Sequence, residues 1–150
     1  MNYRSNLDHI KDMILENQIE KAIEKLNRIK DKTIWHQNLR AVCYMRSGYM
    51  EAALKILIPI VFPKNAIVAD ISVPVKIRLN LVEGMFLAGN IAGAKSLLDS
   101  INEQSEHKIK LVNAYKKWKE SLSFWGRLSA TMGLLPYDKP IKIEYPFGEP

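Results

Sequence analysis

The chain has 150 residues, of which 47% are hydrophobic and 25% are charged. This length predicts one domain with a single core or one short repeat array, and the composition excludes disordered and collagen-like chains. Lysine and arginine number 22 against 16 aspartates and glutamates, leaving a formal net charge of +6. That excess allows an acidic partner without requiring nucleic acid. Cys43 is the only cysteine, which excludes an intrachain disulfide and a multi-thiol metal site.

We expect no targeting or membrane segment from this sequence. Residues 1–9 lack an apolar core of the kind that signal peptides have, and Pro59 interrupts the longest apolar stretch at residues 56–63. With a single cysteine, this favours a cytoplasmic protein without membrane attachment. Cys43 lies in an apolar helical stretch, where a small buried hydrophobe is favoured over a reactive thiol.

Three helical hairpins are predicted in succession. The first helices lie near residues 6–16, 34–47 and 74–88, the second helices near 19–30, 50–58 and 91–103, and the repeats near 6–30, 34–62 and 74–103. Apolar residues recur at helical spacing on both sides of each turn. Because a hairpin of this size cannot bury both faces alone, each must pack against its neighbours.

The turns between paired helices share a pattern. In each turn, a residue that tolerates left-handed backbone is followed five residues later by alanine. The three pairs are Asn17 with Ala22, Gly48 with Ala53, and Gly89 with Ala94. At the same offsets of 31 and 41 residues, Leu26, Leu57 and Leu98 share one column. The alanines let two antiparallel helices approach closely, so these residues are predicted to determine the packing within each repeat.

This pattern resembles the tetratricopeptide repeat, most clearly in the second unit at Ala41, Tyr44, Gly48, Ala53 and Pro63. The resemblance covers about residues 6–102. It implies an all-α fold: a right-handed α-solenoid of antiparallel helix pairs, about seven helices in all, within a repeat domain at residues 1–133. An irregular helical bundle is the alternative.

The connection between the second and third repeats is long and apolar. Pro59 is expected to end the second helix early, and residues 62–74 then form a loop. Its side chains Ile67, Val68, Ile71 and Val73 would be costly to leave in water, so we expect them to pack on the array or on another chain.

After the third repeat, a capping helix is predicted near residues 106–132, with a break near Gly126. Residues 134–150 carry four prolines and are predicted to form an extended tail. Five apolar residues alternate along it: Tyr137, Ile141, Ile143, Tyr145 and Phe147. We therefore expect the tail to fold back over the array, or into the groove of a neighbouring subunit.

The sequence contains no complete motif for catalysis or metal binding. The glycines at positions 84 and 89 have phosphate-loop spacing, but Asn90 and Ile91 stand where lysine and serine or threonine are needed. His9, His36 and His107 each lack a second metal ligand at helical spacing. The prediction is a protein that is not an enzyme and has no cofactor.

The tetratricopeptide resemblance implies that the first helices line a concave groove that binds a peptide. The matched inward positions are Leu7, Lys11, Ile14, Asn38, Val42, Met45, Leu79, Glu83 and Phe86. Most of them are apolar, which favours an apolar peptide. The family's carboxylate clamp is matched only in part, by Lys11, Asn38, Lys76 and Asn80.

The leading hypothesis is an adaptor or chaperone-like scaffold that binds a protein segment of unknown identity. One alternative is nucleic-acid binding through the basic C-terminal helix, where Tyr115, Trp118, Phe124 and Trp125 accompany lysines. It is less favoured because the aromatic residues follow the apolar stripe. Another is an architectural subunit whose groove holds its own tail. Self-association through the tail or the 62–74 loop is a further expectation.

Overall fold

A computed structural model describes residues 3–30, 32–134 and 141–150. Within those residues the chain is all-helical, with eight α-helices, one short 3₁₀ helix and no strand. The helices are α1 (Tyr3–Leu15), α2 (Ile19–Arg28), α3 (Ile34–Arg46), α4 (Met50–Val61), η1 (Pro63–Asn65), α5 (Val75–Leu87), α6 (Ile91–Ser100), α7 (Glu106–Glu120) and α8 (Phe124–Thr131). One more α-helix is therefore present than the seven predicted, because the 106–132 segment divides in two.

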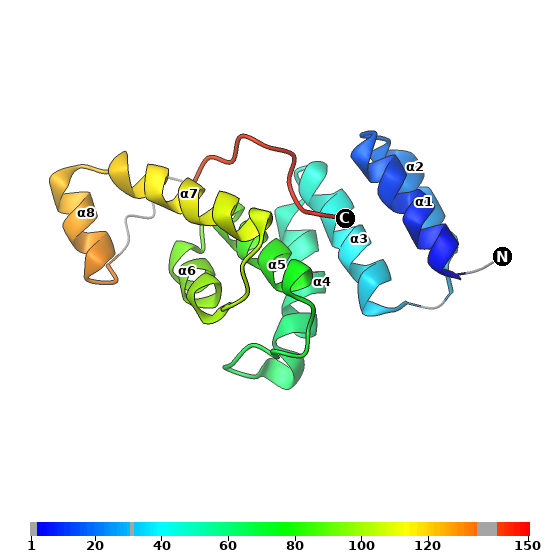
Figure 1. Ribbon diagram of the computed structural model, residues 1–150, viewed down its shortest axis with the longest axis horizontal. Helices are drawn as coiled ribbons and strands as arrows, with labels where there is room; N and C mark the ends of the chain where they lie inside the picture. Colours follow the sequence, from blue (N-terminus) through cyan, green and yellow to red (C-terminus); the bar gives the residue numbers. More distant parts are fainter. Residues whose placement is uncertain (1–2, 31, 135–140) are drawn as a thin grey trace.

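The helices form an elongated row, with α1 and α2 at one end and α8 at the other (Figure 1). Consecutive helices from α1 to α6 contact one another, and alternate helices also touch, α1 with α3, α3 with α5 and α5 with α7. This packing is consistent with a helical repeat. It brings the first helices of the pairs next to each other, with α7 following α5.

The turns of the three hairpins have the same backbone geometry. Asn17, Gly48 and Gly89 have φ angles of 60°, 83° and 83°. In each turn, the amide of the next residue donates to the carbonyl five positions earlier: Gln18 to Met13, Tyr49 to Tyr44, and Asn90 to Met85. This is the Schellman pattern for ending a helix. The alanines that follow, Ala22, Ala53 and Ala94, are completely buried.

The buried apolar side chains form two clusters. The smaller lies at the N-terminal end and joins α1 and α2 to one side of α3, through residues that include Ile10, Ile14, Leu26 and Val42. The larger runs from α3 to α7 and reaches Ile141 in the C-terminal tail. Since α3 contributes to both clusters, it connects the first hairpin to the rest of the array.

Cys43 lies in the smaller cluster and is fully buried. Burial raises the pKa of its thiol from 9.0 to about 12, with Arg46 opposing the shift. We expect the native protein to resist a thiol reagent at pH 8 and to react rapidly once denatured, because the thiolate is the nucleophile. Between pH 9 and 12 the unfolded chain loses a proton that the folded chain keeps, so the free energy of unfolding should fall over that range.

Urea titrations of the wild type and of Cys43→Ala across this pH range measure the effect. The variant lacks the thiol and should show a shallower loss of stability above pH 9. Equal slopes, or fast labelling of the native wild type, would contradict the burial of the thiol.

Pro59 does not end α4, which continues to Val61. The prediction of a helix ending at residue 58 is therefore wrong. Pro59 is exposed and lies in the last turn of the helix, and the Lys55 carbonyl that would have received its missing N–H belongs to an exposed residue. Water satisfies such a carbonyl at little cost, so the proline is accommodated.

The apolar loop after α4 projects from the array. Ile67 is 98% exposed, and Val68 and Ile71 are also mostly exposed, whereas Val73 is buried in the larger cluster. Of the side chains expected to pack on the array or on another chain, Val73 packs on the array, whereas Ile67, Val68 and Ile71 do not. Asp70 sets the loop's shape, because its carboxylate accepts hydrogen bonds from the Ser72 amide and hydroxyl.

The predicted capping helix breaks at residues 121–123, shortly before Gly126. Ser123 caps α8 by accepting a hydrogen bond from the Gly126 amide, which places Gly126 in the first turn of the new helix. Helix α7 packs against α5 and buries Leu111 and Trp118, whereas α8 has no buried residue. Helix α7 therefore covers the array, and α8 adds a partly buried contact through Ala130.

Candidate functional site

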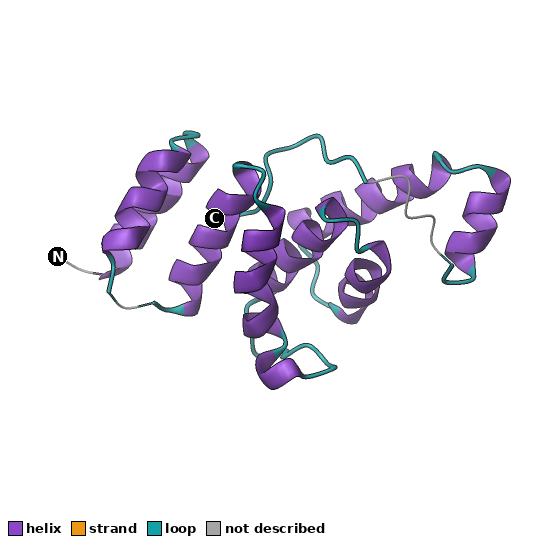
Figure 2. Cartoon of the chain, turned by 180° about the vertical axis from the view of Figure 1, so that it is seen from behind, coloured by secondary structure: helices purple, strands orange, loops and turns teal. Residues whose placement is uncertain are grey.

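The first helices of the pairs and α7 together form one side of the molecule, here called the first-helix face. Residues 141–150 run across it from α7 to α3 (Figure 1), and Figure 2 shows this segment from behind. A cleft of about 360 Å³ lies between the face and the tail. Its helical lining is largely charged and comprises Lys11, Leu15, Arg46, Lys76, Glu83, His107 and Lys110.

Arg46, at the end of α3, joins three segments of the chain. Its Nη1 donates to the Ile14 carbonyl in α1 at 2.6 Å, and its Nε donates to the Phe147 carbonyl at 2.9 Å. Its Nη2 donates to the Gly148 carbonyl at 3.2 Å. Burial lowers the pKa of the guanidinium, with Cys43 and Glu83 opposing that shift. Arg46 thereby fixes both the first hairpin and the tail to α3.

Asn80, in the middle of α5, binds both polar groups of one tail residue. Its Oδ1 accepts from the Glu149 amide at 2.8 Å, and its Nδ2 donates to the Glu149 carbonyl at 2.9 Å. The same Nδ2 donates to Asn38 Oδ1 at 2.9 Å, which links α5 to α3. Both asparagines are fully buried. Because a side-chain amide offers a donor and an acceptor together, Asn80 recognises peptide backbone without regard to the side chain it carries.

Glu83 is completely buried one turn further along α5. Its Oε1 accepts from the Gly148 amide at 3.1 Å, and its Oε2 lies 2.7 Å from His107 Nε2 in α7. His107 is also buried, and its Nδ1 lies 4.0 Å from Glu149 Oε2. A buried carboxylate is costly unless it is paired and hydrogen-bonded, and here α7 and the tail supply both partners.

The end of the tail lies against α5 and α3. Lys76 Nζ donates to the main-chain oxygen of Pro150 at 3.0 Å. Gly148 is buried with a φ of 70°, and a Cβ placed on it would lie 2.9 Å from Val42 Cγ2. The tail backbone therefore approaches α3 more closely than any side chain at this position would allow.

Buried and exposed side chains alternate along the described part of the tail, as predicted. Ile141 is buried, Ile143 and Phe147 pack against the larger core cluster, and Lys142 and Glu144 are exposed. Tyr145 is half-buried, and burial raises the pKa of its phenol. The prediction that the tail folds back over its own array is confirmed for residues 141–150. Tyr137, the first residue of the predicted series, lies outside the described residues.

The predicted groove residues divide between the face and the core. Asn38, Val42 and Glu83 lie beside the tail, and Lys11 lines the cleft. The other five are buried in the two core clusters: Leu7, Ile14, Met45, Leu79 and Phe86. Neighbouring helices therefore enclose most of the predicted apolar groove residues, and the side chains that bond to the tail backbone include Arg46, Asn80 and Glu83.

Arg46 and His107 are site residues that sequence reasoning missed. Lys76 and Asn80 were noticed only as parts of an incomplete carboxylate clamp. A signal was present in α5, where ten consecutive residues, from Ile77 to Phe86, are buried although Arg78, Asn80 and Glu83 are polar. Polar residues within an otherwise apolar helix need partners, which identifies them as candidates for a site.

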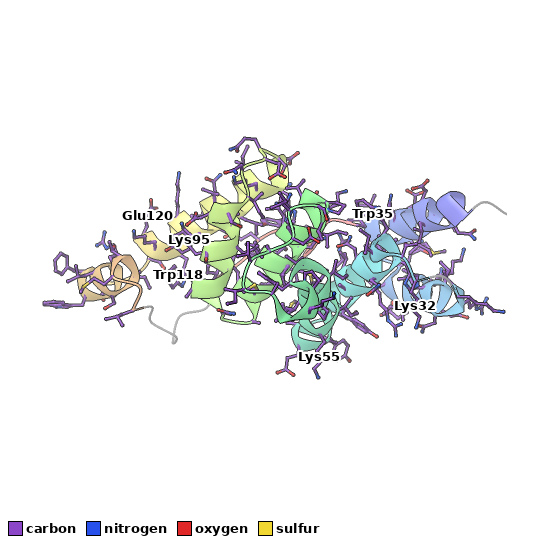
Figure 3. All side chains as sticks on the ribbon, turned by 90° about the horizontal axis from the view of Figure 1, so that it is seen from below. Lys32, Trp35, Lys55, Lys95, Trp118 and Glu120 are labelled. Carbon is purple, nitrogen blue, oxygen red and sulfur yellow. The ribbon has the colours of Figure 1, made fainter. Side chains whose placement is uncertain are left out.

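The aromatic residues proposed for nucleic-acid stacking lie in different environments. Tyr115 stacks on Phe86 and contacts Trp118, which is buried. Lys95 of α6 lies over the Tyr115 ring, and Figure 3 shows Lys95 and Trp118 where α6 meets α7. Phe124 and Trp125 on α8 are exposed, Trp125 by 72%. Only these last two could stack on bases.

No family model, curated protein or solved structure matches this chain. Among the described residues, no group of three His, Cys, Asp or Glu side chains is placed to hold a metal ion. None of the described helices has the length and apolar character needed to cross a membrane. Of the three histidines, His9 is exposed, whereas His36 bonds to the Leu26 carbonyl and His107 to Glu83.

Proposed function

We propose that this chain is a tetratricopeptide-like adaptor, a right-handed helical solenoid whose first-helix face holds an extended protein segment. One observation carries the proposal. Six consecutive main-chain polar groups, from the Phe147 carbonyl to the Pro150 oxygen, are bound by side chains of α3 and α5. Side-chain contacts of this kind to a backbone are how grooves recognise extended peptides.

The architectural alternative assigns the same contacts a purely structural role, with the tail permanently in place. The two functions differ in whether a segment supplied from outside can bind. A ten-residue segment held mainly through its backbone should bind in the micromolar range as a free peptide, because it lacks the advantage of being tethered.

The test uses a chain lacking residues 134–150 and a fluorescent peptide corresponding to residues 141–150. We expect saturable binding in the micromolar range and a rise in the melting temperature of the shortened chain. Asn80→Ala in the same chain should weaken binding about tenfold or more, because it leaves both backbone groups of the clamped residue unpaired. Asn27→Ala, on the exposed surface of α2, is the matched control. A folded shortened chain that binds no peptide would favour the architectural role.

Nucleic-acid binding is a second candidate, favoured by the exposed pair Phe124 and Trp125, whose ring centroids lie 5.6 Å apart, close to Arg127 in the same helix. A single-stranded oligonucleotide titrated against the full chain distinguishes it. Binding that weakens steeply with salt and is lost in Trp125→Ala would support this function. Peptide binding through the polar face should show a weaker dependence on salt.

A further inference from the structure

Among the described tail residues, Gly148 meets the strictest side-chain requirement. The contacts of Arg46, Asn80 and Lys76 are to main-chain atoms, which every residue offers. Gly148 differs, because an added Cβ would lie 2.9 Å from Val42 Cγ2 and 3.1 Å from Val42 Cγ1. Its φ of 70° also lies in the left-handed region that side chains disfavour.

Val42 is poorly able to move away from such a side chain. It is completely buried in the middle of α3 and belongs to the smaller core cluster. Valine in a helix is confined largely to one rotamer, so its two methyl groups stay where they are. The wall that faces Gly148 is therefore rigid, and the face excludes every residue except glycine at this point.

The residues on either side of Gly148 meet complementary surroundings. Phe147 packs against the larger core cluster before the glycine. Glu149 follows it, with its carboxylate 4.0 Å from the buried His107 Nδ1, which has no hydrogen-bond partner among the described residues. Lys11, Lys76 and Lys110 line the same cleft and add positive charge around that carboxylate.

We propose that the first-helix face selects extended segments with the order aromatic, glycine, acidic, and that the chain's own tail is a tethered competitor for partner segments of that pattern. This inference rests on the proposed function, and it adds the class of ligand and the means of its regulation. Val42 is the specificity-determining residue, because it admits only glycine opposite α3.

Tethering determines how strongly the tail competes. A short connection gives the tail an effective concentration in the millimolar range. With micromolar intrinsic affinity, the tail occupies the face nearly all the time, and a free peptide binds about 1,000-fold more weakly than it would to an empty face. Loosening the tail should restore that affinity.

The experiment uses the full chain carrying Gly148→Val and a fluorescent peptide of residues 143–150 in which the glycine is retained. We expect this variant to bind the peptide up to about 1,000-fold more tightly than the wild type does. A peptide with alanine in place of that glycine should bind at least about tenfold more weakly, and part of the loss should be recovered in V42A/G148V. Lys142→Val, on the exposed side of the tail, is the matched control and should behave as the wild type.

The outcomes separate the two proposals. Equal affinity for the glycine and alanine peptides would overturn glycine selection while leaving peptide binding intact. Binding of neither peptide, by a G148V chain with a native circular dichroism spectrum, would overturn both. If G148V fails to fold, the wild type titrated with both peptides to millimolar concentration gives the same comparison. A wild-type dimer that G148V abolishes would assign the occupant to a second copy and overturn competition within one chain.

Discussion

Glu83→Ala is expected to be the most destabilising single substitution on the first-helix face, by about 3–5 kcal/mol. Glu83 is completely buried, and its two oxygens serve His107 on α7 and the Gly148 amide in the tail. Removing the carboxylate leaves both partners buried without an acceptor and creates a cavity in α5. The loss should therefore affect the packing of α7 and the tail together.

Urea unfolding followed by circular dichroism measures this loss. Glu83→Gln keeps an oxygen for the Gly148 amide and nearly the same volume, so it should cost less, about 1–2 kcal/mol. Glu24→Ala is the surface control, because its ion pair with Arg28 is mostly exposed and should change stability by less than about 0.5 kcal/mol. If E83A and E24A were equally mild, the buried pairing of Glu83 would be contradicted.

Arg46→Ala should destabilise the chain by about 3 kcal/mol and release the tail at the same time. Its guanidinium donates to carbonyls of Ile14, Phe147 and Gly148, so its loss leaves acceptors unpaired in two separate segments. Arg46→Lys keeps the charge but not the planar fork of donors, and should recover only part of the stability.

Deletion of residues 134–150 measures how much of the stability lost in R46A comes from the contacts of Arg46 with the tail. In the shortened chain only the bond to Ile14 remains, so R46A should cost less there, by about 1–2 kcal/mol. Arg28→Ala, an exposed arginine in α2, serves as the control in both chains. An identical cost of R46A with and without the tail would mean that the two tail contacts contribute nothing to stability.

The hairpins could be predicted from sequence because their signals are local. Helical spacing of apolar residues, glycine or asparagine at the turns, and an alanine five residues later all act within about 15 residues of chain. The equal turn geometry at Asn17, Gly48 and Gly89 follows directly from this pattern. The alternation of apolar and polar residues along the tail could also be predicted from sequence. Its apolar side faces the array.

The errors arose where the outcome depends on distant contacts. A proline breaks a helix where its missing N–H leaves a carbonyl without a partner. Pro59 lies near an exposed end of its helix, where water can satisfy that carbonyl. Exposure of Ile67 and Ile71, and of α8, depends on whether another surface is close enough to cover them. Neither question is answered by the local pattern.

Backbone preferences and side-chain periodicity are enough to predict an all-helical chain of similar hairpins followed by an extended, alternating tail. The chemistry of the first-helix face, in contrast, depends on how the helices pack. Arg46, Asn80 and Glu83 lie on different turns of two helices, and they converge on Gly148 and Glu149 only after α3 and α5 pack together. The closeness of Val42 to a glycine 106 residues away likewise arises from the path of the folded tail, which no local pattern specifies.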